Sequence, residues 1–224
     1  MAFFKVSTDQ DKIRDGGNGN FITKSGFYDV VIKHVLVNKS STGSESLDLV
    51  IDYNGQEQMI YQAIRLTNRN GEENFGAALF HKLCIVIGAE DGEEIGDPVE
   101  VQLPIGRNGE MKDCMELMDF RDQPVTLRIQ LEYTKSDDKI YENKRIKNIF
   151  RTTDKATASE IVNKTEPKQY KEEEQYQDLI TYKDGLTAED IAHWKKNGRN
   201  SGTTGTGGEL KKTFQRHSFG RSAA

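Results

Sequence analysis

The stretch "SGFYDVVIKHVLVNKSSTGSESLDLVIDYNGQEQMIYQAIRL", residues 25–66, decides the fold because it contains three consecutive strands. The first strand carries apolar side chains on one face at Tyr28, Val30, Ile32, Val35 and Val37. The alternation slips by one residue after Ile32, which predicts a β-bulge near Lys33 and His34. Residues 40–44, "SSTGS", are then predicted to form a turn.

The second strand is predicted to have one apolar face and one wet face. Its apolar face consists of Leu47, Leu49, Ile51 and Tyr53, and its wet face of Asp48, Val50 and Asp52. This alternation with a period of two is typical of a half-buried strand. The dipeptide Asn54-Gly55 follows, and it is a strong signal for a two-residue hairpin. Residues 56–66 are therefore predicted to return as the third strand.

A helix and a second strand pair complete the pattern. Residues 74–88, "NFGAALFHKLCIVIG", have apolar residues near helical spacing, and Gly88 is a typical helix stop. A later strand alternates inward at Val125, Leu127, Ile129, Leu131 and Tyr133, and residues 139–151 return after a loop. Three strands, a helix and a strand pair are the order of a five-stranded OB-type barrel with one capping helix. We therefore expect a mainly β domain over residues 20–151, closed because a barrel leaves no exposed edge.

The rest of the chain is predicted to lie outside this barrel. The predicted segments are 1–19, a flexible N-terminal arm; 152–185, a polar linker; 186–198, a short amphipathic helix; and 199–224, a flexible basic tail. The linker prediction follows from a shortage of apolar residues that could form a core. The helix prediction depends on Thr187 as N-cap, with Ile191 and Trp194 three residues apart on one face.

Charge is spread unevenly along the chain, whose formal net charge is −5. Residues 191–224 contain seven Lys and Arg side chains against Glu209, a net charge of +6, so the preceding residues carry −11. A basic tail of this kind can bind nucleic acid, an acidic partner or the acidic body of its own protein. The charge count does not choose among these three.

The cysteines and the hydropathy pattern indicate the compartment. Cys84 and Cys114 provide no framework of disulfides, and Cys84 lies in an apolar run where a reduced thiol is expected. No segment approaches the roughly 20 apolar residues that span a bilayer, and the N-terminus lacks the apolar stretch of a secretory signal. We therefore expect a soluble, intracellular protein.

Motifs that would indicate catalysis are missing from the sequence. There is no phosphate-binding glycine loop, no G-x-S-x-G elbow and no Cys/His spacing typical of zinc. The four histidines fall in separate segments, and the acidic run at 90–94 is more typical of a solvated turn than of a cation site. We expect no enzymatic activity, no metal and no cofactor.

Binding has more support from the sequence. The return strand 139–151 carries five Lys and Arg side chains against Glu142, a net charge of +4, and includes Tyr141. Cations that track phosphates and aromatic rings that stack on bases hold single-stranded nucleic acid. A charged strand face is more commonly only a solvated face, and the acids Asp48 and Asp52 would repel phosphate if they lined the same groove. From these residues alone, DNA binding and a plain solvated face explain the pattern equally well.

Three segments of the sequence also show a resemblance to a known family. "SGFYDVVIKHVLVNKSSTGSESLDLVIDYNGQ", "GAALFHKLCIVIGAEDGE" and "FRDQPVTLRIQLEYTKSDDKIYENKRIKNIF" together resemble small OB-fold single-stranded DNA-binding proteins of tailed bacteriophages, over roughly residues 20–151. The resemblance implies sequence-independent coating of single-stranded DNA in phage replication, recombination or repair, in the host cell cytoplasm. It also implies phage or host replication or recombination proteins as partners. Many such proteins end in an acidic tail, whereas this chain ends in a basic one.

This reading assigns roles to particular side chains. Electrostatic capture of phosphates is predicted for Lys33, Arg65, Lys135, Lys144, Arg145, Lys147 and Arg151, and stacking for whichever of Tyr53, Tyr61, Tyr133 and Tyr141 face outward. Partner binding is predicted for Ile191, Trp194, Lys211, Lys212, Phe214 and Arg216. The alternative is a protein-interaction adaptor or virion component that uses a small β-barrel and the basic tail. A nuclease accessory factor is a third possibility, which the missing metal motif disfavours.

Overall fold

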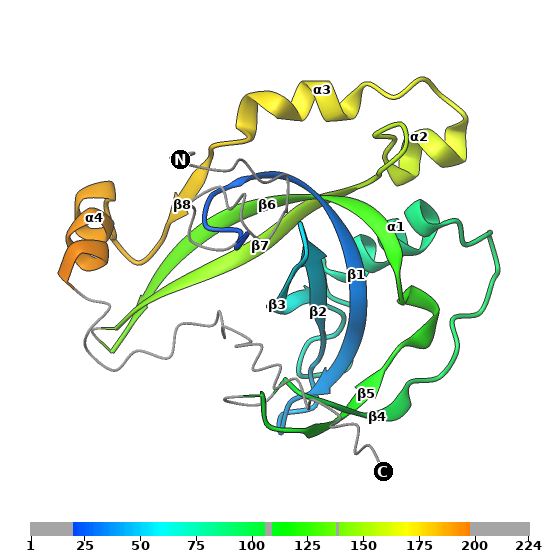
Figure 1. Cartoon of the computed structure of the whole chain (residues 1–224), viewed down its shortest axis with the longest axis horizontal. Helices are drawn as coiled ribbons and strands as arrows, with labels where there is room; N and C mark the ends of the chain where they lie inside the picture. Colours follow the sequence, from blue (N-terminus) through cyan, green and yellow to red (C-terminus); the bar gives the residue numbers. More distant parts are fainter. Residues whose placement is uncertain (1–19, 106–108, 138, 198–224) are drawn as a thin grey trace, which may run out of the picture.

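The computed structural model describes residues 20–105, 109–137 and 139–197, and these residues form a mainly β structure. The strands make one sheet in which every neighbouring pair is antiparallel except the last, β6 with β8. The sheet is not closed into a barrel (Figure 1). The mainly β class is therefore confirmed, but the predicted closed barrel is not observed.

The first three strands form a meander, as predicted. They are β1 (Gly26–Lys39), β2 (Glu45–Tyr53) and β3 (Gln56–Arg65). The register of β1 against β2 shifts between Ile32 and His34, which confirms the predicted bulge. The hairpin between β2 and β3 turns at Asn54 and Gly55, whose φ angles of 51° and 79° fit a two-residue turn of type I′.

The length and curvature of β1 organise the rest of the sheet. One side of β1 pairs with β2; the other pairs first with β6 (Gln123–Ser136) and then with β5 (Lys112–Glu116), which β4 (Val99–Leu103) extends. The hairpin of β6 with β7 (Lys139–Arg151) projects beyond the body of the sheet (Figure 1). The order β3-β2-β1-β6-β7 leaves β3 and β7 at opposite ends of this path.

Helix α1 (Ala77–Ile87) lies between β3 and β4 in the chain, as the sequence predicted, and covers the main core. Its C-cap Gly88 has a φ of 106°, a left-handed conformation in which glycine is favoured. Leu83 and Val86 of the helix are buried against the inner face of the sheet. A short 3₁₀ turn, η2 (Met118–Phe120), leads from β5 into β6.

The inner face of the sheet is as predicted, but its outer face is not fully wet. Leu47, Leu49 and Ile51 are buried in the main core. Val50, predicted on the wet face of β2, is buried in a second core, which consists of Leu36, Val50, Met59 and Leu103. The β4–β5 hairpin supplies Leu103 and thereby covers this part of the outer face. A sequence pattern within β2 does not report such distant cover.

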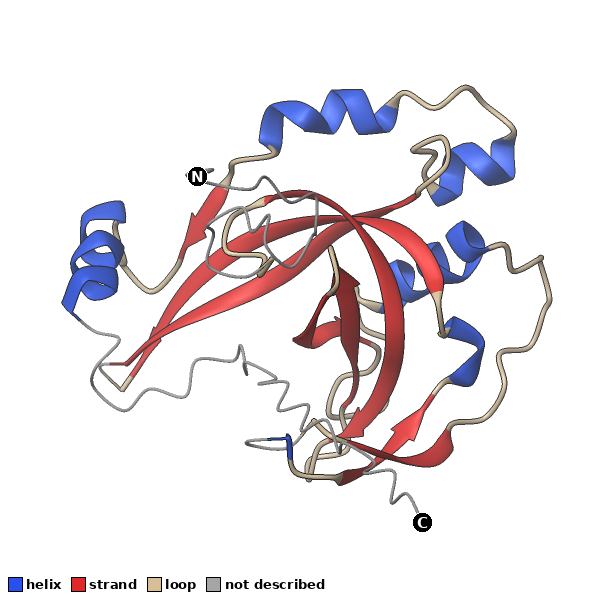
Figure 2. Cartoon of the chain, viewed as in Figure 1, coloured by secondary structure: helices blue, strands red, loops and turns tan. Residues whose placement is uncertain are grey.

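Residues 152–197, which we call the C-terminal strap, fold against the sheet rather than extending as a linker. The strap contains α2 (Ala158–Asn163), α3 (Gln169–Glu173), η3 (Glu174–Tyr176), β8 (Ile180–Tyr182) and α4 (Ala188–Asn197). It runs back across the sheet above β6 and β7 (Figure 2). The prediction of a polar linker over 152–185 is therefore wrong.

The strap is held to the sheet by a few separate contacts, because it has no continuous apolar face. The ring of Tyr170 packs on Phe27 and Phe150 at centroid distances of 4.6 and 5.4 Å. Arg128 of β6 forms a nearly buried ion pair of 2.8 Å with Glu173. Strand β8 then pairs in parallel with residues 131–133 of β6. Such scattered contacts explain why an apolar-poor segment is still ordered.

The helix predicted near 186–198 is present as α4, with the predicted cap. Thr187 Oγ1 accepts a hydrogen bond from the backbone N–H of Asp190, whose carboxylate accepts one from the N–H of Thr187. Ile191 is only 5% exposed, packed with Leu131 and Tyr133. Both predicted end segments, 1–19 and 199–224, lie outside the described residues. Within the described ranges, no helix is long and apolar enough to cross a membrane.

Candidate functional site

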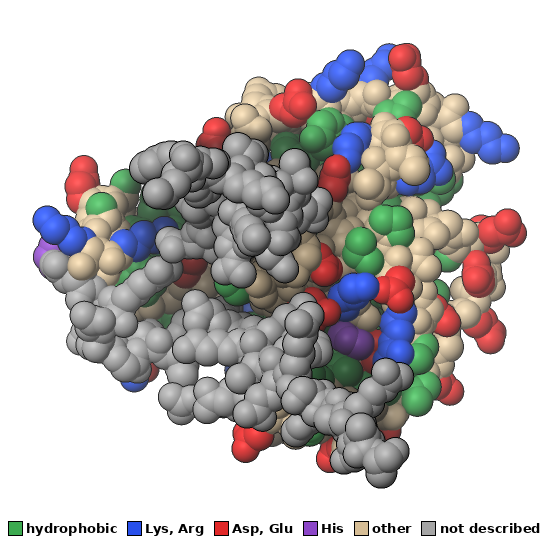
Figure 3. Space-filling view, in the orientation of Figure 1, with side chains coloured by type: hydrophobic (Ala, Val, Ile, Leu, Met, Phe, Trp, Pro, Cys, Tyr) green, Lys and Arg blue, Asp and Glu red, His purple; other side chains and the backbone are tan. Residues whose placement is uncertain are grey.

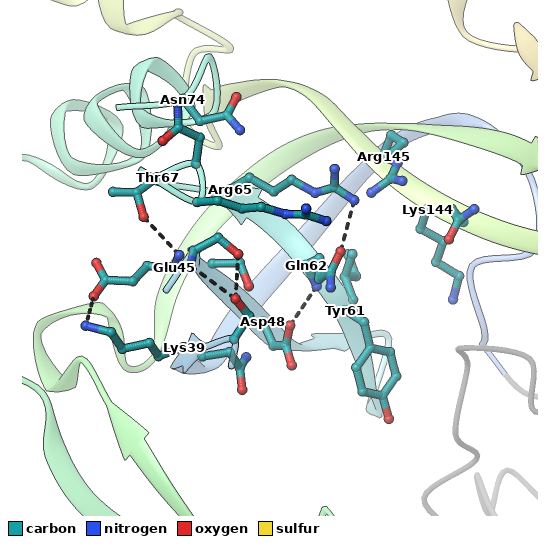
Figure 4. A pocket seen from close by; sticks show the side chains of 18 residues that line it. Lys39, Glu45, Asp48, Tyr61, Gln62, Arg65, Thr67, Asn74, Lys144 and Arg145 are labelled. Carbon is teal, nitrogen blue, oxygen red and sulfur yellow. Dashed lines mark hydrogen bonds and ion pairs between the residues drawn. The ribbon is translucent and has the colours of Figure 1, made fainter. Parts of the chain in front are cut away.

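A pocket of about 640 Å³ opens on the outer face of β2 and β3. We call it the β3–β7 groove; its charged and aromatic lining consists of Lys39, Glu45, Asp48, Tyr61, Arg65, Arg69, Lys144 and Arg145, and its amides include Gln62 and Asn143. Five Lys and Arg side chains thus face two carboxylates in a molecule that is acidic overall. Figure 4 shows these side chains reaching in from the β1–β2 turn, from β2 and β3, and from β7.

A bulge in β3 shapes the floor of the groove. Leu47 pairs with Ile64 and Leu49 with Ile60, so three residues of β3 face the single residue Asp48 of β2. The middle residue, Gln62, has a φ of 46°, and its backbone N–H donates to Asp48 Oδ1 at 2.6 Å. A left-handed residue other than glycine stores strain, and strain of this kind is found at functional sites. The bulge lifts the exposed side chain of Gln62 into the groove.

Arg65 is the cation at the end of β3. Its Nη2 donates to Gln62 Oε1 at 3.0 Å (Figure 4), the one hydrogen bond of its side chain among the described residues. A guanidinium has five N–H donors, so most remain available to a ligand. The next element packs closely behind Arg65, because a Cβ at Gly76 would lie 2.1 Å from the Arg65 carbonyl oxygen. The backbone that carries this arginine is thus firmly supported.

Tyr61 supplies an aromatic ring to the same face. Its ring packs partly against the second core and also lines the groove. Burial raises the pKa of the phenol, and the negative charge of Asp48 raises it further. The hydroxyl therefore stays neutral, and a ring held in this way can accept a stacked base at little entropic cost.

Strand β7 supplies the opposite wall. Lys144 Nζ donates to Gln58 Oε1 at 3.1 Å, a bond that crosses from β7 to β3. Burial lowers the pKa of Lys144, an effect that nearby Glu142 partly opposes. Arg145 donates to Glu132 Oε1 at 3.0 Å, so its charge is partly compensated within the chain.

The two carboxylates of the groove are held by the chain itself. Glu45 Oε1 accepts from Lys39 Nζ at 3.1 Å. Burial raises the pKa of Asp48, and hydrogen bonds from the Gln62 backbone and the Asn38 side chain oppose the rise. The groove therefore keeps a positive balance.

The structure brings together four of the eleven side chains predicted to bind DNA: Tyr61, Arg65, Lys144 and Arg145. The others lie elsewhere: Lys33, Tyr53, Tyr133, Lys135, Tyr141, Lys147 and Arg151. Lys33 is paired with Asp122 at 2.6 Å and Arg151 with Asp154 at 2.5 Å. Tyr53 packs edge-on against Tyr28.

Tyr133 faces inward, as the alternation of its strand predicted, so it is not among the tyrosines that could stack on a base. The side chain of Tyr133 is fully buried, between Tyr182 and Trp194 of the strap, and its hydroxyl donates to Glu142 Oε2 at 2.6 Å. Lys135, Tyr141 and Lys147 lie along the β6–β7 hairpin outside the groove.

Sequence reasoning also missed other lining residues, among them Lys39, Gln62, Arg69 and Asn143. A signal existed for Lys39 and Arg69. In an antiparallel meander, the end of the first strand and the end of the third lie at the same end of the sheet. Basic residues in the turns "NKSSTGS" and "TNRNG" are therefore expected to converge.

The predicted partner-binding residues divide into two groups. Ile191 and Trp194 pack on Leu131 and Tyr133 of the same chain. Ile191 is therefore not available to an external partner, and that prediction is wrong. The other four, Lys211, Lys212, Phe214 and Arg216, lie outside the described residues.

Among the described residues, no three His, Cys, Asp or Glu side chains are close enough to hold a metal ion. Burial raises the pKa of the Cys84 thiol to about 11, which disfavours the reactive thiolate. No protein-family model matches this chain, and a comparison with curated proteins finds no significant match.

Proposed function

We propose that this protein binds single-stranded DNA, without dependence on base sequence, in the β3–β7 groove. The observation that carries the proposal is the lining of the groove, which combines Tyr61 with five Lys and Arg side chains. Phosphates would contact the cations while a base stacks on the ring. An exposed stack of this kind contributes about 1 to 3 kcal/mol and tolerates every base, because every base has a π-face.

The topology supports the same proposal. We propose that the sheet is an open OB-type sheet, with β1, β2 and β3 followed by α1 and by β6 and β7, and with β6 beside β1. OB folds bind nucleic acids on the face of their second and third strands and at the loops joining strands one to two and four to five. The groove lies on the face of β2 and β3, next to the β1–β2 turn. The departure is that β3 and β7 are not paired as a ladder.

The biological setting is proposed from the resemblance of residues 20–151 to phage proteins. It is coating of single-stranded DNA during phage replication, recombination or repair in the host cytoplasm, without catalysis by this chain. Replication or recombination proteins would be the partners.

Fluorescence anisotropy with the full chain and a labelled oligothymidylate of about 20 nucleotides, longer than common OB-fold sites, tests the proposal. We expect affinity that falls steeply with salt, because binding releases condensed counterions. Tyr61→Ala should weaken binding about 10-fold. Arg65→Ala should weaken binding and reduce the salt slope by about one contact.

Matched controls come from the opposite side of the sheet. Tyr182→Ala and Lys171→Ala in the strap remove an aromatic ring and a cation that do not line the groove, and they should leave the affinity unchanged. Tyr141→Ala reports whether the strand of DNA continues along the β6–β7 hairpin. Equal effects of the groove and strap variants, or no binding at low salt, would contradict the proposal and favour a protein-binding adaptor.

A further inference from the structure

The outer side of β4 is an open edge of the sheet. Within the described residues, β4 pairs with β5 alone and ends the path β3-β2-β1-β5-β4. Its other side therefore presents backbone N–H and C=O groups without strand partners in the described structure. Such an edge is a template for an added strand.

Apolar side chains lie on both faces beside this edge. Val99 is 50% exposed and Met115 is 44% exposed. They lie on opposite faces of the β4–β5 hairpin, because Val99 pairs with Glu116 whereas Met115 pairs with Glu100. An added strand alternates its side chains between the two faces, so a matching strand would carry apolar residues an odd number of positions apart.

The described residues of the segment 89–119, which contains β4 and β5, are strongly acidic. The exposed carboxylates of the described residues 89–119 are Glu90, Asp91, Glu93, Glu94, Asp97, Glu100, Glu110, Asp113 and Asp119, against Lys112 as the one basic residue there. Figure 3 shows acidic side chains gathered at the right of the molecule, over the loop that follows α1. The N–H of Gly96 donates to Asp119 Oδ2 at 2.9 Å, which ties this loop to η2.

The negative charge of this segment determines which kind of strand could pair with the open edge of β4. A second copy of β4 would bring the same carboxylates and be repelled, whereas a basic strand is attracted. Residues 209–221, "ELKKTFQRHSFGR", contain Lys211, Lys212, Arg216 and Arg221 against Glu209. Phe214 and Phe219 are five residues apart, so an extended chain places them on opposite faces.

We propose that residues 209–221 of the same chain add as a strand to the outer edge of β4. The tail is long enough to span a distance comparable to the width of the folded body. A body of this size has a radius of gyration of about 16 Å. The residues between Asn197 and Lys211 span up to about 45 Å when extended. The proposal is independent of nucleic-acid binding, and its tests contain no nucleic acid.

Carbodiimide crosslinking of the full chain, followed by mass spectrometry, tests the location. We expect crosslinks from Lys211 and Lys212 to Glu94, Asp97 or Glu100. They should be lost in about 1 M salt, where the Debye length is about 3 Å. The double variant Glu94→Lys with Glu100→Lys should abolish them. The matched control, Glu172→Lys with Glu174→Lys on α3 and η3, makes the same change in net charge and should keep them.

A mixture of isotopically heavy and light chains distinguishes the source of the tail. Crosslinks within one copy support the proposal; crosslinks mainly between heavy and light copies would overturn it in favour of exchange between molecules. Crosslinks scattered over other acidic surfaces, or retained by the Glu94 and Glu100 variant, would also overturn it.

Amide hydrogen exchange tests the strand pairing itself. Deleting residues 198–224 should speed exchange of the outward amides of β4 about 10-fold or more, because their proposed partner strand is removed. The β2–β3 ladder should show no change. Equal exchange of β4 in the full and shortened chains would overturn the proposed pairing, even if charge still brought the tail nearby.

Discussion

The basic residues beside the strap and those of the β3–β7 groove differ in how completely carboxylates of the same chain pair with them. On the strap side, Arg128 is paired with Glu173, and Lys183 reaches Glu132 at 2.8 Å. On the groove side, Arg65 bonds only to a neutral amide among the described residues. The charges beside the strap fasten the chain. In the groove, Lys39 and Arg145 are paired with Glu45 and Glu132, but Arg65 has no carboxylate partner among the described residues. A basic residue therefore indicates ligand binding only when the groups of the same chain that pair with it are known.

Removing a strap anchor is expected to have the largest effect. Glu173→Ala should lower the free energy of unfolding by about 3 kcal/mol, because it leaves the nearly buried Arg128 without its carboxylate. Arg128 Nε already has no hydrogen-bond partner, so little compensation is at hand. Urea denaturation measures the loss.

The neighbour Glu172 is exposed and provides the control. Glu172→Ala should change the free energy of unfolding by no more than about 0.5 kcal/mol. DNA affinity of the folded Glu173 variant should stay near that of the unchanged chain. A Glu173 variant that unfolds with the same free energy as the unchanged chain but binds DNA more weakly would contradict these roles of the strap and the groove.

A smaller effect is expected at the turn between α2 and α3. Burial raises the pKa of Glu160, but hydrogen bonds from the N–H groups of Gln169, Lys168 and Thr157 outweigh it and lower the pKa to about 2. Glu160→Gln should cost about 1 to 2 kcal/mol at neutral pH, because those bonds to an ionised acceptor are weakened.

The sign of the pH dependence follows from the lowered pKa. The folded state holds the ionised Glu160, so its stabilisation is fully present above the ordinary pKa of 4.5 and is lost as the pH falls toward about 2. The difference between the unchanged chain and the Gln variant in urea should shrink over that window. A difference that stayed constant with pH would show that the carboxylate does not act through its charge.

The smallest effect is expected inside the groove. Asp48→Asn should tighten DNA binding about two- to fivefold, because it removes a negative charge near the phosphates while keeping an acceptor for Gln62. Anisotropy at low and high salt should show the gain at low salt only. Asp52→Asn, on the same strand but outside the groove lining, is the control. If Asp48→Asn instead bound DNA more weakly, the Asp48 carboxylate would position Gln62 in a way that an amide cannot.

Local chemistry allowed a good part of the fold to be predicted. The bulge near Lys33, the Asn54-Gly55 hairpin, helix α1 and the Thr187 cap each depend on a few neighbouring residues and are present. These features are set by backbone conformations that the sequence specifies directly.

The predictions that were wrong concern residues whose surroundings depend on contacts between distant segments. Val50 has the wet-face pattern of its own strand, but the β4–β5 hairpin supplies a cover over it. The strap itself is fastened by Tyr170 and by Glu173, in a segment otherwise poor in apolar residues. The groove was found only in part for the same reason, since Gln62 enters it through the bulge in β3 and Asn143 through the placement of the β6–β7 hairpin.

The parallel pairing of β8 with β6 also matters during synthesis. Residues 131–133 leave the ribosome long before their partners at 180–182, and until then Leu131 and Tyr133 have neither β8 nor α4 over them. A nascent chain in this state exposes an apolar strand edge, which is the kind of surface that chaperones bind. For the same reason, a recombinant fragment that stops at residue 151 should aggregate, and the shortest well-behaved form should extend to the end of α4.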